Sequence, residues 1–300
     1  MKILSFHTGD YRVRGGVLVD DEHLVDIAEL AELRSVQLPT DVRELVAVPD
    51  VVARLHDLMA EGREALPSAA IRNLDQVVLK APLRPGKVVG VGLNYVAHVE
   101  ESRRTLDTAK DLPTRPVLFS KPATAVVGHG EPIRHNSALT SELDWECELA
   151  VVIGRRASQV TAGEALDHVF GYSIINDVSA RDQRRSGQWF FSKGQDSYAP
   201  FGPWIVTADE IADPQALDFR LTVNGDEKQN SNTRYMLFTI AQLIEDISSG
   251  VTLEPGDVIA TGSAEGVGAG LVPPQYLQPG DVVELTIDKI GTLTNPVVAV

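Results

Sequence analysis

The pattern of hydrophobic and polar positions predicts a chain built mainly from short strands. Residues 149–153 are wholly apolar and largely β-branched, and they end at Gly154, as is typical of a buried strand. Helical periods are fewer, for example at 161–168 and 241–248, whereas strand-like runs recur at 2–6, 87–91, 116–120, 170–175, 217–223, 258–261 and 282–287. Because strands outnumber helices and do not alternate with them, we expect an α+β fold that is mostly β, a mixed β-sandwich or roll.

The pattern of predicted strands and helices changes near residue 81 and divides the chain into two parts. Before it, short strands at 2–6, 16–20 and 23–27 are followed by helical patterns at 30–34 and 51–66. A segment rich in proline and glycine comes next, at 81–86, and the strand-rich part of the chain begins beyond it. We therefore expect a small N-terminal α/β domain at residues 1–75 and a larger domain at residues 76–300.

Composition and charge narrow the functional classes. The 300 residues are 43% hydrophobic and 23% charged, which is ordinary for a globular protein, and the formal net charge is −15. So acidic a chain is a poor match for nucleic acid or an anionic membrane. No run of about 18 apolar residues occurs, and the N-terminal residues lack the apolar core of a signal peptide. A cytoplasmic location is therefore expected, and the single cysteine, Cys147, excludes an intramolecular disulfide.

Two carboxylates stand at the head of the central buried strand. Glu146 and Glu148 are two positions apart, so their side chains point the same way, roughly 6 to 7 Å from each other along the strand. Like charges at this spacing repel each other, and one would take up a proton unless a cation lay between them. A third acid, Asp177, ends another strand. Three carboxylates suit Mg²⁺ or Mn²⁺, although a solvated strand end and a cap for the next turn are the simpler alternatives.

A possible general base follows the strand at 87–92. If residues 96–101 are helical, His98 and Glu101 are at positions i and i+3 and meet on one face. A carboxylate beside an imidazole fixes its tautomer and raises its basicity, but His98 could equally be an ordinary surface histidine. Residues 102–116 are polar without an apolar period and are expected to form a loop that covers the site.

The loop at 262–270 contains four glycines, whose backbone N–H groups can approach an anion closely. It lacks the Gly-Lys-Ser/Thr ending of a nucleotide-binding P-loop, so nucleotide binding is not expected.

Taken in order, these motifs resemble the fumarylacetoacetate hydrolase family over about residues 85–296. The residues that carry the resemblance are Gly-x-Asn-Tyr-x-x-His-x-x-Glu from Gly92 to Glu101, Glu-x-Glu at 146 and 148, Asn-Asp-x-x-x-Arg-Asp from Asn176 to Asp182, Lys193, and Thr261-Gly262 with Gly266-Val267-Gly268. The chain looks most like bacterial members with a small N-terminal domain, some of which are oxaloacetate decarboxylases or acylpyruvate hydrolases. The resemblance implies a mixed β-sandwich roll that is usually a homodimer.

The resemblance also implies a role for each matched residue. Glu146, Glu148 and Asp177 match the family's Mg²⁺ or Mn²⁺ ligands, and His98 and Glu101 match its water-activating dyad. Lys193 matches a lysine that orients water or substrate, and Arg181 and Thr261 match positions that line the substrate pocket. Arg184 stands at the place of a frequent pocket glutamine, with Gln183 one position earlier. It either supplies an extra cation for a second substrate carboxylate or points to solvent.

The implied activity is Mg²⁺- or Mn²⁺-dependent cleavage of a carbon–carbon bond in a 2-oxo acid, most simply a 2,4-dioxo acid as in acylpyruvate hydrolases, through a metal-bound pyruvate enolate. Lys193 and the amides of the glycine loop would stabilise the developing oxyanion. Oxaloacetate decarboxylation and the hydration or isomerisation of 2-oxo-enoates use the same enolate and remain open alternatives. A binding or assembly protein that has lost catalysis is the alternative from another class.

Overall fold

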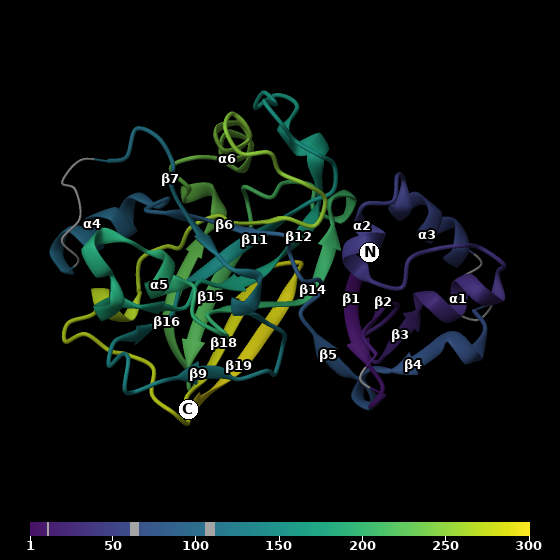
Figure 1. The fold of residues 1–300 in the computed structure, drawn as a ribbon, viewed down its shortest axis with the longest axis horizontal. Coiled ribbons are helices and arrows are strands. Elements are labelled where there is room, and N and C mark those ends of the chain that lie inside the picture. Colours follow the sequence, from purple (N-terminus) through teal and green to yellow (C-terminus); the bar gives the residue numbers. More distant parts are fainter. Residues whose placement is uncertain (11, 61–65, 106–111) are drawn as a thin grey trace.

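Strands dominate the computed structural model of the protein, as the apolar pattern predicts (Figure 1). The structure describes residues 1–10, 12–60, 66–105 and 112–300. Within them the chain forms a twelve-stranded, a five-stranded and a two-stranded sheet, and both parallel and antiparallel pairs occur. The expectation of a mostly β fold with mixed sheets is confirmed.

The twelve-stranded sheet runs through the whole molecule. Its main path is β4-β3-β2-β1-β14-β12-β11-β17-β6-β7, with β5 paired to β1 and β8 to β14. The strands are β1 (Lys2–His7), β2 (Arg14–Leu18), β3 (His23–Asp26), β4 (Ile71–Asn73), β5 (Val78–Lys80), β6 (Val88–Gly92), β7 (Val117–Lys121), β8 (Val126–Val127), β11 (Cys147–Ile153), β12 (Val169–Asn176), β14 (Ala199–Thr207) and β17 (Val258–Ala260).

The five-stranded sheet packs on one face of the large sheet. It runs in the order β16-β15-β18-β19-β9. Its strands are β9 (Ile133–His135), β15 (Asp218–Val223), β16 (Asp226–Asn232), β18 (Val282–Ile287) and β19 (Gly291–Ala299), and the two-stranded sheet joins β10 (Leu143–Asp144) to β13 (Ser179–Ala180).

The central strand β11 separates two hydrophobic cores. Its odd-numbered side chains, such as Leu149 and Val151, share a cluster with Leu285 of the five-stranded sheet. Its even-numbered side chains, Ala150 and Val152, share a second cluster with residues of the N-terminal helices. Glu146 and Glu148 continue the even-numbered series and therefore lie on the face turned away from the five-stranded sheet.

The N-terminal strands and helices lie at one end of the molecule (purple in Figure 1). The helices are α1 (Ile27–Leu33), α2 (Val42–Val46) and α3 (Val51–Met59). The helix expected at 51–66 thus ends at Met59, and residues 61–65 lie outside the described residues. Strand β1 pairs with β14, with Lys2 opposite Val206, so the N-terminal strands extend the large sheet. A domain boundary at residue 75 stays a prediction.

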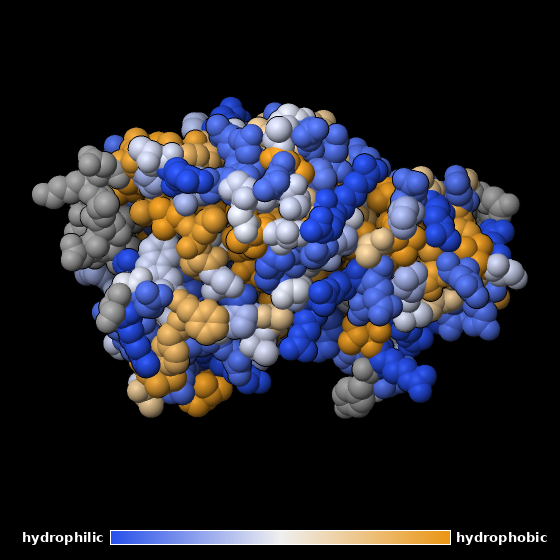
Figure 2. Space-filling model, turned by 45° about the horizontal axis from the view of Figure 1, so that its top comes forward, coloured by the Kyte–Doolittle hydropathy of each residue, from blue (hydrophilic) through white to orange (hydrophobic). Residues whose placement is uncertain are grey.

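The remaining helices are α4 (Val96–Thr105), α5 (Phe190–Lys193) and α6 (Ile240–Ser248). The first four residues of the loop expected at 102–116 belong to α4, and residues 106–111 of that loop lie outside the described residues. At 161–168, only Ala165–His168 is helical, as a short 3-10 turn. None of the helices in the described ranges has the length and apolar character needed to cross a membrane. Hydrophilic side chains cover much of the face in Figure 2, with apolar areas between them.

One glycine allows the close approach of β12 and β14. A Cβ atom at Gly171 would lie only 2.3 Å from the carbonyl oxygen of Val206. We expect Gly171→Ala to lower the free energy of unfolding by about 1–3 kcal/mol, because the strands must separate to admit the methyl group. Gly250→Ala is the control, since its Cβ would meet nothing within 4 Å. Thermal denaturation of both variants tests this, and equal melting temperatures would contradict it.

Candidate active site

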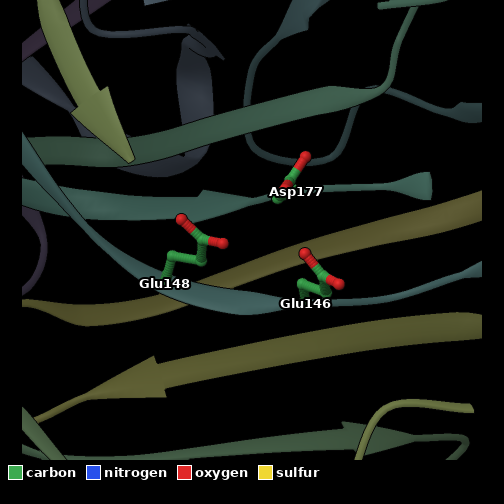
Figure 3. A group of neighbouring side chains, drawn as sticks. All are labelled: Glu146, Glu148 and Asp177. Atoms are coloured by element: carbon green, nitrogen blue, oxygen red, sulfur yellow. The ribbon is translucent and has the colours of Figure 1, made fainter. Parts of the chain in front are cut away.

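Three carboxylates converge where β11 begins and β12 ends. Figure 3 shows Glu146, Glu148 and Asp177 as neighbouring side chains. One ligand atom from each lies within 4.8 Å of the others, and all three residues are buried. The antiparallel pairing places Cys147 opposite Asn176, and the backbone N–H of Asp177 donates to the carbonyl of Glu146 at 2.9 Å. The pairing of β11 with β12 thus brings Asp177 next to Glu146, although the two are far apart in the sequence.

The pKa values of both glutamates in this triad are strongly shifted. Burial raises the pKa of Glu148 well above its usual range, and the carboxylates of Asp177 and Glu146 raise it further. Burial acts on Glu146 in the same direction, but Lys193, Arg181 and His98 outweigh it and hold the pKa of Glu146 well below its usual value. Among the described residues, Oε1 of Glu148 is buried and has no hydrogen-bond partner. A buried carboxylate oxygen without a donor fits a divalent cation.

Two lysines contact the triad. Lys193, from α5, donates to Oε2 of Glu146 at 2.8 Å and to Oδ2 of Asp177. Lys121, at the end of β7, is fully buried and forms an ion pair with Oδ1 of Asp177 at 2.6 Å. Burial lowers the pKa of Lys121 to about 8, although Asp177 partly offsets it. Lys121 was not among the predicted site residues, because a lysine at the end of an ordinary strand gives no sign of which residue it contacts.

Arg181 connects the triad to a fourth buried carboxylate. Its Nε donates to Asp144 at 2.8 Å, and one terminal nitrogen donates to Oε1 of Glu146 at 2.7 Å. Asp144 also accepts from the backbone N–H groups of Gly268 at 2.6 Å and Ala269 at 3.0 Å. Asp144 was not among the predicted site residues. The sequence gives one indication of its role. Asp144 stands two positions before Glu146, so that acidic residues occupy three alternate positions, 144, 146 and 148.

The expected dyad forms on α4. Nδ1 of His98 lies 3.2 Å from Oε2 of Glu101, one turn later on the same face. Oε1 of Glu101 accepts from the backbone N–H of Gly266 at 3.0 Å. A Cβ at Gly270 would lie 2.1 Å from Cδ of Glu101, so the Glu101 carboxylate occupies the space beside this glycine where the helix contacts the loop. The dyad is thereby held against the glycine loop.

The glycine loop binds carboxylates of the chain itself. Gly262 donates to Oε2 of Glu148 at 2.8 Å, and Gly266 and Gly268 donate to Glu101 and Asp144 as described above. These amides thus approach anions, as their glycines indicate. They were predicted to stabilise a reaction intermediate, whereas in the structure these three donate to acidic side chains.

One cavity brings most of the predicted residues together. His98, Glu146, Arg181, Arg184 and Lys193 line it. It is completed by side chains that were not predicted, Trp189, Ser192 and Ser263, and by residues 91–93.

Thr261 differs from the other predicted residues, because it is fully buried and does not line the cavity. Its hydroxyl donates to the carbonyl of Leu149 at 2.9 Å. A role of Thr261 in binding the substrate stays a prediction.

One protein family and several characterised proteins are similar to this chain. The family model described as "Fumarylacetoacetate (FAA) hydrolase C-terminal" matches residues 87–298. The chain is 38% identical to oxaloacetate tautomerase YisK of Bacillus subtilis over 98% of this chain and 100% of that protein. It is 40% identical to a mitochondrial oxaloacetate tautomerase of Xenopus laevis over 83% of this chain and 80% of that protein.

Two solved structures of related proteins are similar to this one over the whole chain. Maleylpyruvate hydrolase from Sphingobium sp. SYK-6, in complex with manganese(II) and pyruvate, superimposes with a TM-score of 0.79 at 31% identity and covers 100% of this chain and 99% of its own. A fumarylacetoacetate hydrolase from Exiguobacterium antarcticum gives 0.81 at 38% identity, with 100% of both chains covered.

The contacts of Asp144 lead to a stability prediction. Asp144→Asn should lower the free energy of unfolding by about 3–5 kcal/mol, because it leaves Arg181 without one partner of a buried ion pair. Asp182→Asn is a matched control, since Asp182 is exposed and accepts from Thr140 and Ser141. That variant should lose no more than about 1 kcal/mol. Urea denaturation measures both, and equal losses would show that the Asp144 network is not stabilising.

Proposed function

The chain belongs to the fumarylacetoacetate hydrolase family, and from this premise we propose that it is a Mg²⁺- or Mn²⁺-dependent enzyme that cleaves a carbon–carbon bond of a 2,4-dioxo acid, as acylpyruvate hydrolases do. The observation that carries the proposal is that His98, which pairs with Glu101, lines the same cavity as Glu146 of the buried carboxylate triad.

Glu146, Glu148 and Asp177 would hold the metal ion. The unpaired oxygen of Glu148 and the raised pKa values of Glu148 and Asp177, in which burial is the leading cause, support this assignment. The maleylpyruvate hydrolase with similar structure was solved with manganese(II) and pyruvate. When bound, the metal supplies a Lewis acid and a template for the carboxylate and 2-oxo group of the substrate.

The remaining residues would carry the proton chemistry. His98, oriented by Glu101, removes a proton from water, which attacks the distal carbonyl of the substrate. The bond between the two acyl parts then breaks, and pyruvate leaves as its enolate. Lys193, which contacts Glu146 and Asp177 in the cavity wall, is placed to orient the water or the substrate. His98, as its conjugate acid, can return the proton to the enolate carbon.

A second candidate is the tautomerisation of oxaloacetate. Two relatives that are 38% and 40% identical carry that activity in their names. The step needs a base that moves a proton between carbon 3 and the enol oxygen of the substrate, and it needs no attacking water. His98 is the group in the cavity that can do this. A spectroscopic assay for the enol of oxaloacetate distinguishes this activity from the release of pyruvate.

The metal proposal predicts a loss of binding as well as of turnover. EDTA should abolish activity, and Mn²⁺ should restore it. Glu148→Gln should weaken Mn²⁺ binding in calorimetry by about 100-fold or more, the upper end of the effect of losing a residue that merely supports a ligand. Glu164→Gln, at an exposed position, is the control. Unchanged Mn²⁺ affinity in Glu148→Gln, or full activity without metal, would refute the assignment.

The dyad proposal predicts a selective effect. His98→Gln should slow hydrolysis of acetylpyruvate by about 10²–10⁴-fold, the usual contribution of a general base. Decarboxylation of oxaloacetate needs no activated water and should fall much less. His56→Gln, whose histidine side chain is half exposed, should change neither rate. Equal losses of both activities in His98→Gln would mean that His98 does not activate water.

A further inference from the structure

Gln229 carries a buried side-chain amide on an edge strand. It lies on β16, at the edge of the five-stranded sheet, and only 1% of it is exposed. Its Oε1 accepts from the backbone N–H of Cys147, on the central strand of the large sheet, at 2.8 Å. Its Nε2 donates to the hydroxyl of Ser263 and to the carbonyl of Ala264, both at 2.9 Å. The amide therefore connects the five-stranded sheet to β11 and to the glycine loop at the same time.

Cys147 stands between the two glutamates of the triad, beyond the point where β11 has a neighbouring strand on both sides. In a strand, the N–H and C=O groups of one residue point to the same side, and successive residues alternate. On the side of Cys147, β17 pairs with residues 150–152, and the N–H of Thr261 then donates to the carbonyl of Leu149 at 3.1 Å. In the part of the chain that the structure describes, this backbone ladder ends there, so Cys147 needs other partners.

Two side chains take the place of the missing strand. Gln229 accepts from the N–H of Cys147, and the hydroxyl of Ser263 donates to the carbonyl of Cys147 at 3.1 Å. Since Gln229 also donates to Ser263, the three residues form a closed ring of hydrogen bonds. A side-chain amide offers the same donor and acceptor as a peptide group, so a glutamine can satisfy backbone groups in this way. The backbone between the two glutamates is thereby held on the side that faces away from β12.

The strand that carries Gln229 also contacts the glycine loop through its backbone. A Cβ at Gly266, whose φ is +94°, would lie 2.0 Å from the carbonyl oxygen of Lys228. The N–H of the same glycine donates to Glu101 of the dyad. None of the described residues that line the cavity belongs to the five-stranded sheet. Strand β16 nevertheless touches the segments that carry the triad and the dyad.

We propose that Gln229 is a positioning residue of the active centre. By fixing the backbone of Cys147, it holds Glu146 and Glu148 at the separation that a divalent cation requires. The directions of these two side chains follow from the backbone of the residue between them, so a shift of that residue changes both. Gln229 itself does not line the cavity and acts only through Cys147 and the loop. This inference rests on the proposed function, in which the triad holds the metal ion.

The test measures the Mn²⁺ affinity of a variant that keeps the length of the side chain and loses its hydrogen bonds. Gln229→Met should weaken Mn²⁺ binding in calorimetry by about 10–100-fold, the usual effect of removing a group that orients metal ligands. The EPR spectrum of the bound Mn²⁺ should also change, because it reports the geometry of the ligands. Unchanged Mn²⁺ affinity in Gln229→Met would overturn the inference.

Thr233→Val is the matched control. Thr233 directly follows β16 and is fully buried, and its hydroxyl donates to the carbonyl of Pro214 at 2.8 Å and accepts from the N–H of Leu217 at 3.0 Å. The variant thus loses buried hydrogen bonds of the same region that do not involve the triad or the glycine loop. It should lower the melting temperature and leave the Mn²⁺ affinity and the EPR spectrum unchanged. An equal loss of Mn²⁺ affinity in both variants would mean that general destabilisation is the cause.

Ser263→Ala tests whether Gln229 acts through Cys147. It removes the hydrogen bond to the carbonyl of Cys147, so it should also weaken Mn²⁺ binding. Because both side chains hold the same residue, the double variant should lose less affinity than the product of the two single losses. Losses that multiply would contradict this shared route. Gln229→Asn, whose amide is one methylene shorter, replaces Gln229→Met in all measurements if the latter does not fold, with the same expected direction.

Hydrogen exchange separates this inference from the proposed function, because it needs no metal. In Gln229→Met, the backbone amides of residues 145–149 should exchange faster than in wild type, whereas in Thr233→Val they should not. If wild type binds Mn²⁺ and Gln229→Met binds it equally well, the inference is wrong while the proposed function stands. If wild type binds no Mn²⁺, the proposed function is wrong, and exchange then decides the role of Gln229. Faster exchange would support the positioning of this segment, and unchanged exchange would overturn it.

Discussion

Buried negative charge is the constraint on which this structure depends. Asp144, Glu146, Glu148 and Asp177 are each at most 5% exposed, and an uncompensated carboxylate in such a place would be strongly destabilising. The chain meets this requirement with two lysines, one arginine and the amides of the glycine loop. At Gly268, a Cβ would lie 2.0 Å from the carbonyl oxygen of Gln275, so only glycine lets this amide reach Asp144. The loop and the acids therefore have to be considered as one unit.

This unit explains why the sequence predicted one half of the site better than the other. Glu148 lies on β11 and Glu146 directly precedes that strand, and His98 and Glu101 lie on one helical turn, so local periodicity places each pair. Lys121 and Asp144, in contrast, contact residues that are distant in the sequence. Asp144 bonds to a residue 124 positions away. No local pattern encodes such contacts. The extension of the large sheet by β1 was missed for the same reason, since its partner β14 lies about two hundred residues later.

The glycine loop shows a related limit of sequence patterns. Clustered glycines indicate amides that can surround an anion, but they do not indicate which anion. Here the amides of Gly262, Gly266 and Gly268 donate to Glu148, Glu101 and Asp144. The same loop thus touches the triad, the dyad helix and the partner of Arg181. It thus connects these three groups through its own backbone.

The position of Arg184 and Trp189 has a consequence for how such an enzyme can diverge. The acid triad lies where β11 begins and β12 ends, and the side chains of both strands form the hydrophobic cores, so a change there disturbs folding. Arg184 and Trp189 belong to a connecting segment of short turns between β13 and α5. Substitutions in that segment can alter the shape and charge of the cavity without moving the triad. Related chains could acquire new substrates by changing this segment while inheriting the same reactive centre.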